Sequence, residues 1–174
     1  MKIGIVIRDA SEASAIGAWV LALTRSASAR GWEIHVISER ASAGRIAAAG
    51  GQTHLTVPGR WGGAFGLWVF ARRARRELKA EPLELVVGSA ECPDPHILLV
   101  PAPPEPGTAG KALRRAFKRA RFRLAVVGDD AAAQVLQESF GVPRERIAVA
   151  PPPPPGASER EWANRAEAFW MAVA

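Results

Sequence analysis

The sequence predicts an α/β fold: a Rossmann-like, mainly parallel sheet of about six or seven strands with helices on both faces. Two patterns predict it. Short runs of aliphatic and β-branched residues recur along the chain, and amphipathic helical stretches separate them, with no internal repeat. The 174 residues are 48% hydrophobic, which suffices for one domain with a buried core.

Each predicted strand is a short apolar run bounded by turn-forming residues. The first run, KIGIVIR, is β-branched and indicates a buried strand. In chain order, the predicted strands are 2–8, 32–38, 52–58, 83–89, 96–101, 123–130 and 146–150.

Each predicted helix places its apolar residues on one face. In the first helix this face consists of Ile16, Trp19, Val20, Leu23 and Ala27. Gly31 ends that helix. The stretch 130–140 has Asp129 or Asp130 as its N-cap and Gly141 as its C-cap. The other predicted helices are 41–51, 64–79, 111–122 and 158–174.

The last part of the chain combines a proline run with a helix. The prolines at 151–155 predict an extended polyproline II segment of roughly 3.1 Å per residue. Ser158 and Glu161 then form a capping-box pair. The helix beyond them carries one apolar stripe: Trp162, Ala166, Phe169, Trp170 and Val173. We therefore expect a domain at 1–150, a linker at 151–157, and a helix at 158–174 that packs back on the domain. Docking of this helix on another chain is the alternative.

The closing stretch of the domain, RLAVVGDDAAAQVLQESFGVPRERIAVAPPPPPG, resembles the end of the first domain in family 4 glycosyltransferases of the GT-B type. GVPRERIAV is its clearest part. The opening strand KIGIVIR with its small-residue loop is similar to the start of that domain, and SEREWANRAEAFW resembles the final helix, which crosses back from the second domain. The resemblance covers nearly all of this chain but only about half of a family member.

This resemblance implies the acceptor-binding half of a bacterial, cytoplasmic glycosyltransferase without its nucleotide-sugar domain. No stretch matches the phosphate-contacting cations or the carboxylate pair of that second domain. We therefore expect the chain to need a donor-binding partner for sugar transfer and to be inactive alone; a homo-oligomer is a further possibility. The alternative is a non-catalytic module that binds a phosphorylated, lipid or protein ligand.

Ligands of open α/β sheets bind outside the carboxyl ends of the strands. Polar residues in three predicted loops there are the candidates for binding the acceptor: Asp9, Ser11, Ser14 and Gly17, then Ser89, Glu91 and Asp94, then Gly128 and Asp129. A carboxylate among them is suited to act as general base on an acceptor hydroxyl. Helix capping and turn formation are the alternative roles of these residues. No catalytic residue is assigned.

The formal net charge is +6 and the pI about 10.6. Two helices concentrate the positive charge: Arg72, Arg73, Arg75 and Arg76 in one, and Arg114, Arg115, Lys118 and Arg119 in the other. The first cluster follows Phe65, Trp68 and Val69, which lie off the apolar stripe of their own helix. Cations beside exposed aromatic residues favour an anionic membrane surface. A solvated arginine face is the alternative.

Several classes of function are disfavoured by the sequence. No apolar run reaches the roughly 18–20 residues that span a bilayer, and no signal peptide is recognisable, so we expect a cytoplasmic protein with peripheral attachment to the inner face of the membrane as a possibility. One cysteine and three histidines give no basis for a metal site, and no cofactor is expected. Nucleic-acid binding lacks any recognised module.

Overall fold

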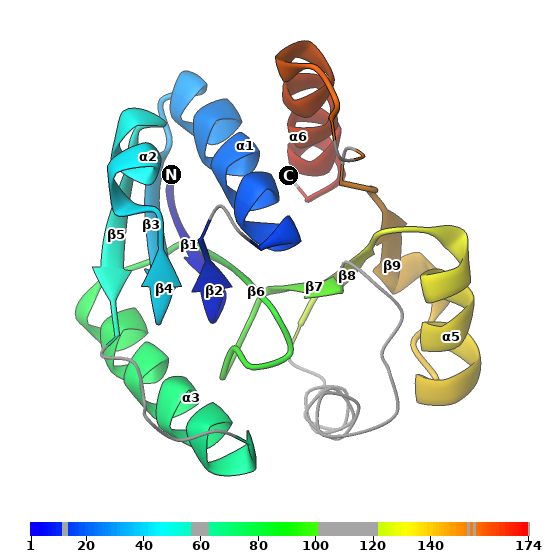
Figure 1. Ribbon diagram of the computed structural model, residues 1–174. Helices are drawn as coiled ribbons and strands as arrows, with labels where there is room; N and C mark the ends of the chain where they lie inside the picture. Colours follow the sequence, from blue (N-terminus) through cyan, green and yellow to red (C-terminus); the bar gives the residue numbers. More distant parts are fainter. Residues whose placement is uncertain (12–13, 57–62, 101–121, 153, 155, 174) are drawn as a thin grey trace.

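The computed structural model describes residues 1–174 except 12–13, 57–62, 101–121, 153, 155 and 174. Its main sheet has seven parallel strands in the order β5-β3-β1-β6-β7-β8-β9, which confirms the predicted α/β class (Figure 1). The strands of this sheet are β1 (Lys2–Val6), β3 (Glu33–Ser38), β5 (Gly51–Leu55), β6 (Leu85–Gly88), β7 (Ile97–Val100), β8 (Leu124–Val127) and β9 (Ile147–Val149).

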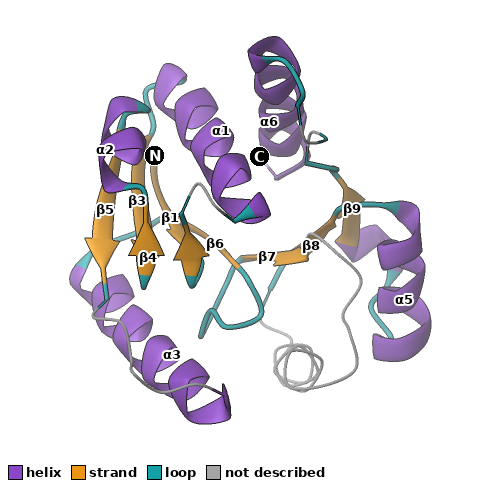
Figure 2. Cartoon of the chain, in the orientation of Figure 1, coloured by secondary structure: helices purple, strands orange, loops and turns teal. Residues whose placement is uncertain are grey.

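Helices cover both faces of the sheet, as Figure 2 shows. Alternate residues of the strands belong to different core clusters, and the helical residues in each cluster show which face a helix covers. By this criterion, α1 (Ala15–Ala29), α2 (Ala43–Ala48) and α6 (Glu159–Val173) share one face, whereas α3 (Gly63–Ala80) and α5 (Asp130–Phe140) share the other.

The helix ends follow from local sequence. Asp129 caps α5 by accepting a hydrogen bond from the backbone N–H of Ala132 at 2.7 Å. Gly141 ends α5 in the left-handed conformation, at φ 66°, where a side chain would be strained. Ser14 caps α1 in the same way, through the N–H of Gly17 at 2.9 Å. The caps that the sequence predicts for α5 are thus confirmed.

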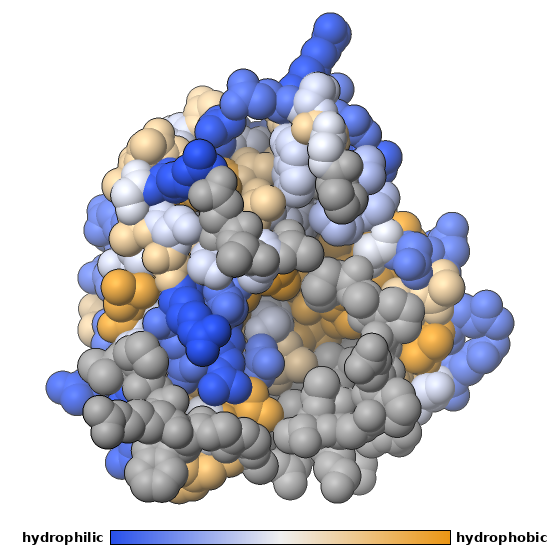
Figure 3. Space-filling model, in the orientation of Figure 1, coloured by the Kyte–Doolittle hydropathy of each residue, from blue (hydrophilic) through white to orange (hydrophobic). Residues whose placement is uncertain are grey.

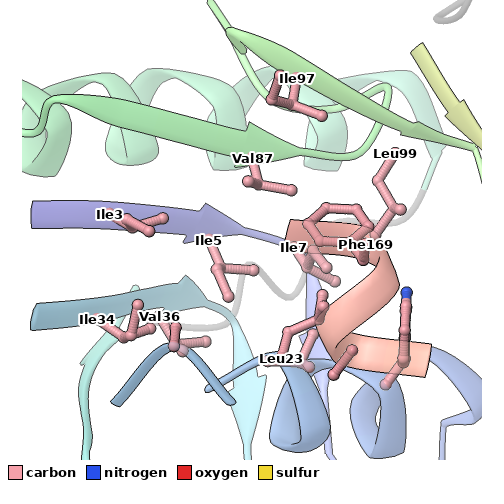
Figure 4. Packing of buried hydrophobic residues seen from close by; sticks show 14 of the residues in the cluster. Ile3, Ile5, Ile7, Leu23, Ile34, Val36, Val87, Ile97, Leu99 and Phe169 are labelled. Carbon is pink, nitrogen blue, oxygen red and sulfur yellow. The ribbon is translucent and has the colours of Figure 1, made fainter. Parts of the chain in front are cut away.

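The largest core cluster lies between the sheet and α1. Figure 4 shows Ile7, which follows β1, beside Leu23 of α1 and Phe169 of α6, with Ile3 and Ile5 of β1 in the same cluster. All five are buried. At about 25 cal/mol per Å² of buried apolar surface, such a cluster is the main stabilising contribution to the domain.

Helix α6 packs against α1 and completes this cluster. Trp170 is fully buried, its ring lies edge-on to Trp32 at 5.5 Å, and its indole Nε1 donates to the carbonyl of Leu23 at 3.1 Å. Arg30, the C-cap residue of α1, also pairs with Glu167 of α6 at the rim of the contact. The stripe predicted from helical spacing is therefore the face that contacts α1.

Three short elements were not predicted. The two-residue strands β2 (Asp9–Ala10) and β4 (Arg40–Ala41) pair in parallel beyond the ends of β1 and β3, and a 3₁₀ turn, η1 (Arg144–Arg146), precedes β9. Most of the helix predicted at 111–122 lies outside the described residues.

Candidate functional site

The strand order reverses at β1 in the main sheet. The chain passes from β1 to β3 and β5 on one side, and then returns to build β6 to β9 on the other. At such a point the loops that follow the two central strands separate and leave a crevice, which is where open α/β sheets bind ligands. The loops after β1 and β6 flank this position, and both contain candidate residues.

The loop after β1 is held together by its own side chains. Asp9 Oδ1 accepts hydrogen bonds from the backbone N–H of Ser11 at 2.9 Å and from its hydroxyl at 2.6 Å. Arg40 of β4 lies 3.6 Å from the other carboxylate oxygen. Burial opposes ionisation of Asp9, but the Ser11 hydrogen bonds and the Arg40 charge outweigh it and lower its pKa below the usual value. Asp9 is therefore a carboxylate that accepts hydrogen bonds.

The same loop closes over the start of α1. Ser14 Oγ donates to the carbonyl of Asp9 at 3.0 Å while it caps the helix at Gly17. A Cβ built on Gly17 would lie 1.8 Å from the carbonyl oxygen of Ser11, so only glycine fits under this loop. The structure thus brings all four predicted residues together and gives Ser14 and Gly17 structural roles.

The loop after β6 contains Ser89 and Glu91, which are joined by a hydrogen bond from the Ser89 hydroxyl to the Glu91 carboxylate. Asp94, predicted with them, faces another part of the molecule, since its carboxylate lies 3.5 Å from Arg75 of α3. Asp94 and Arg75 line a groove beside α3 together with Lys79 and His96. Only Ser89 and Glu91 of this set are therefore paired with each other.

Cys92 lies in this loop and is buried. Burial raises the pKa of its thiol to about 12, with a further contribution from the carboxylates of Asp94 and Glu91. Because the thiolate is the reactive form, we expect iodoacetamide at pH 8 to alkylate the folded protein at least roughly 100-fold more slowly than the unfolded protein. Since this is the only cysteine, mass spectrometry of intact protein reports it directly. Equal rates in buffer and in guanidinium chloride would contradict the burial of this loop.

Gly128 and Asp129 follow β8. Asp129 is the N-cap of α5, and Asp130 behind it is exposed in the first turn of the helix. Capping therefore accounts for the Asp129 side chain, whose Oδ1 accepts from the backbone at 2.7 Å.

Sequence reasoning missed one charged pair at this edge. Arg8 Nε donates to Glu39 Oε2 at 2.7 Å, and Glu39 is only 8% exposed. Its second oxygen, Oε1, is buried and has no hydrogen-bond partner among the described residues. The two residues are 31 positions apart, and their one signal in the sequence is that each lies within two residues of a strand end. In Figure 3 a strongly hydrophilic patch lies over the ends of β2 and β4.

The basic cluster of α3 lies at the surface, whereas Arg114, Arg115, Lys118 and Arg119 of the second predicted cluster lie outside the described residues. Arg72, Arg75 and Arg76 are exposed, and Arg73 is half-buried. Trp68 and Phe65, predicted to lie off the apolar stripe, are 56% and 52% exposed. The stripe itself, with Phe70 and Ala74, is buried.

Two of the three histidines contact each other under α3. His35 Nδ1 lies 2.8 Å from His54 Nε2, and the remaining ring nitrogens face Glu33 at 3.0 Å and Glu77 at 3.9 Å. These contacts account for the polar groups of the pair. Within the described residues there is no cluster of three or more histidine, cysteine or acidic side chains that could hold a metal ion. None of the helices in those parts of the chain is long and apolar enough to cross a membrane.

Comparisons with known proteins relate the chain to glycosyltransferases through its fold. No family model matches the sequence, and no curated protein sequence matches it. Against WaaG, a glycosyltransferase involved in lipopolysaccharide biosynthesis, the TM-score is 0.71 at 14% identity, over 86% of this chain and 45% of WaaG. Against a glycosyltransferase from Rickettsia africae ESF-5 it is 0.63 at 9% identity, over 98% of this chain and 50% of that one. Against the glycotransferase of kitacinnamycin the TM-score is 0.52 at 15% identity, over 90% of this chain and 52% of that one.

The chain thus spans about half the length of these structural neighbours, which are GT-B glycosyltransferases. At these identities the comparison concerns the fold, and it confirms the Rossmann-like class that the sequence predicts. The chain has the fold of one half of a GT-B glycosyltransferase.

Proposed function

We propose that the chain is the acceptor-binding half of a GT-B glycosyltransferase of the family 4 kind, and that sugar transfer requires a donor-binding partner. The observation that carries this proposal is the half-length match: nearly all of this chain superposes on about half of each neighbour. Sequence resemblance of GVPRERIAV to the end of the first domain supports the acceptor side.

The chemistry of the carboxyl edge suits a ligand rich in hydroxyl groups. Asp9 and Glu91 are acceptors, and Ser11 and Ser89 hydroxyls stand beside them. A sugar hydroxyl donates to a carboxylate and accepts from a serine hydroxyl, so these pairs can exchange their internal hydrogen bonds for ligand contacts. In the proposal Asp9 or Glu91 orients the acceptor hydroxyl, and one of them accepts its proton as the glycosidic bond forms.

Transfer also needs positive charge around the departing nucleotide diphosphate, and donors for it must be in place before reaction. The proposal assigns these groups to the partner. It also identifies α6 with the helix that crosses back from the second domain in the family resemblance. The packing of α6 on α1 is compatible with that assignment.

The first test is calorimetric titration of the purified chain with nucleotide-sugars and nucleoside diphosphates. The proposal expects no binding heat, because the donor site belongs to the partner. Micromolar binding of any of them would replace the proposal with a complete enzyme.

The acceptor side is tested by NMR titration with a panel of oligosaccharides and glycolipid headgroups. We expect amide shifts to concentrate at residues 9–17 and 88–91, and Asp9→Asn to weaken binding about tenfold or more through loss of a charge-assisted hydrogen bond of roughly 1.5–3 kcal/mol. Glu138→Gln is the matched control, since Glu138 is an exposed acid on α5 that contacts Gln134. Shifts confined to other surfaces would overturn the acceptor role.

A non-catalytic binding module is the second candidate. The observation in its favour is that Ser14 and Asp129, two of the residues predicted at the carboxyl edge to bind the acceptor, are engaged as helix caps. This second candidate would be favoured if the chain bound a saccharide but no sugar were transferred to it when a donor-binding subunit and its nucleotide-sugar were added.

A further inference from the structure

Helix α3 presents one continuous outward face. Phe65, Trp68, Arg72, Arg76 and Lys79 stand at i, i+3, i+7, i+11 and i+14, which at 100° per residue places them within a narrow arc. All five are exposed. The opposite side of the helix, with Phe70 and Ala74, is buried against the sheet. The outward face therefore has no role in the packing of the core.

The aromatic part of this face is unusually apolar for a surface. The rings of Phe65 and Trp68 stack at 5.7 Å between centroids, and each residue is more than half exposed. Arg72 lies over the Trp68 ring at 5.7 Å from its centroid. Two adjacent large aromatic rings exposed to water at one end of a helix indicate a surface that binds a partner.

The rest of the face is cationic. Helix α3 carries five basic residues and a single acid, Glu77, and that acid faces His54 on the sheet. Arg75 pairs with Asp94, whereas Arg72, Arg76 and Lys79 point outward on the same arc as the two rings. The outward arc is thus aromatic at the N-terminal end and positively charged along the remainder.

We propose that this face of α3, defined by Phe65, Trp68, Arg72, Arg76 and Lys79, docks on an anionic lipid bilayer. The aromatic pair enters the headgroup–acyl boundary, where indole and phenyl rings are favoured, and the cations contact lipid phosphates. Each cation near an anionic bilayer surface contributes about 1 kcal/mol, so the charge complementarity is sufficient for reversible binding.

The geometry favours a bilayer over single-stranded nucleic acid. Bases bind proteins by stacking on free aromatic faces. Here the Trp68 ring already contacts two neighbours on the same helix, since it stacks with Phe65 and Arg72 lies over it. Both aromatic residues are more than half exposed, and the headgroup region of a bilayer accepts aromatic side chains.

The orientation of α3 gives the docking a consequence for the candidate site. Because α3 connects the carboxyl end of β5 to the amino end of β6, its N-terminal aromatic turns lie toward the carboxyl edge of the sheet (Figure 1). Docking through Phe65 and Trp68 would bring that edge close to the lipid surface. A membrane-borne acceptor follows from this only if the proposed acceptor role holds; the docking itself does not depend on it.

The test is sedimentation of the full chain with neutral phosphatidylcholine vesicles and with vesicles containing 30% phosphatidylglycerol, roughly the anionic content for which the per-charge estimate applies. We expect binding only to the anionic vesicles and loss of binding at high salt. Arg72→Gln/Arg76→Gln should weaken partitioning roughly 30-fold, at about 1 kcal/mol per charge and 1.4 kcal/mol per tenfold. Trp68→Ala should weaken it about tenfold or more.

The controls have equal charge and similar exposure. Arg160→Gln/Arg165→Gln removes two exposed cations from α6, and Met171→Ala removes the most exposed large apolar side chain. Both should bind vesicles as the parent chain does. Failure to bind anionic vesicles at low salt, or equal loss in the α6 double variant, would overturn the proposal. So would binding of single-stranded DNA that is lost in the Arg72/Arg76 variant while vesicles are ignored.

Discussion

Replacing Trp170 with alanine is expected to lower the free energy of unfolding by about 3–5 kcal/mol, the range for removal of a large buried aromatic side chain. The ring is fully buried between α6 and α1, in edge-on contact with Trp32 at 5.5 Å and Phe169 at 4.9 Å. The substitution leaves a cavity at this contact and also leaves the Leu23 carbonyl without the indole donor.

Urea unfolding followed by circular dichroism measures this effect, with Met171→Ala as the control. Met171 is the next residue and is 73% exposed, so its truncation should change stability by no more than about 0.5 kcal/mol. A loss below about 1 kcal/mol for Trp170→Ala would mean that α6 is not part of the cooperative core.

Gly17→Ala is expected to destabilise the domain by about 1–3 kcal/mol or more, although the same change in an ordinary helix interior is stabilising by roughly 0.5–1 kcal/mol. The added Cβ would lie 1.8 Å from the carbonyl oxygen of Ser11, which is backbone and cannot rotate away. The loop would have to move, and with it the hydrogen bonds that hold Asp9 and Ser14.

Thermal unfolding of the variant is compared with that of Gly44→Ala. Gly44 lies in α2, and a Cβ there would meet nothing within 4 Å, so this variant should be neutral or slightly more stable. NMR should show shifted amides at residues 9–14 in Gly17→Ala only. A Gly17→Ala variant that is as stable as Gly44→Ala would contradict the tight closure of this loop.

The sequence predicted the regular elements well because their signals are local. Both caps of α5, Asp129 and Gly141, are residue types that act on the adjacent turn. The buried stripe of α6 and the exposure of Phe65 and Trp68 follow from helical periodicity alone. The parallel direction of the strands also follows, because strands that alternate with helices are joined by crossover connections.

The site was predicted only in part because its geometry depends on contacts between distant segments. Arg8 and Glu39 meet because two strand ends are neighbours in the sheet, a pairing that no spacing in the sequence encodes. The strands β2 and β4 have two residues each, too few to show a period. Asp94 was grouped with Ser89 by its position in the loop, but its carboxylate pairs with Arg75, on a helix that precedes that loop.

The hydrogen bond from Trp170 to Leu23 joins residues 147 positions apart, and this separation bears on biosynthesis. During translation the residues of α1 leave the ribosome long before those of α6. The apolar surface around Trp19 and Leu23 therefore stays exposed to water until α6 has been synthesised and packs on it. A nascent chain that stops before residue 162 exposes this surface and is a substrate for chaperones and for aggregation. Ribosome-bound chains stalled before and after α6 should therefore differ in chaperone recruitment, even though the sheet strands are already synthesised in both.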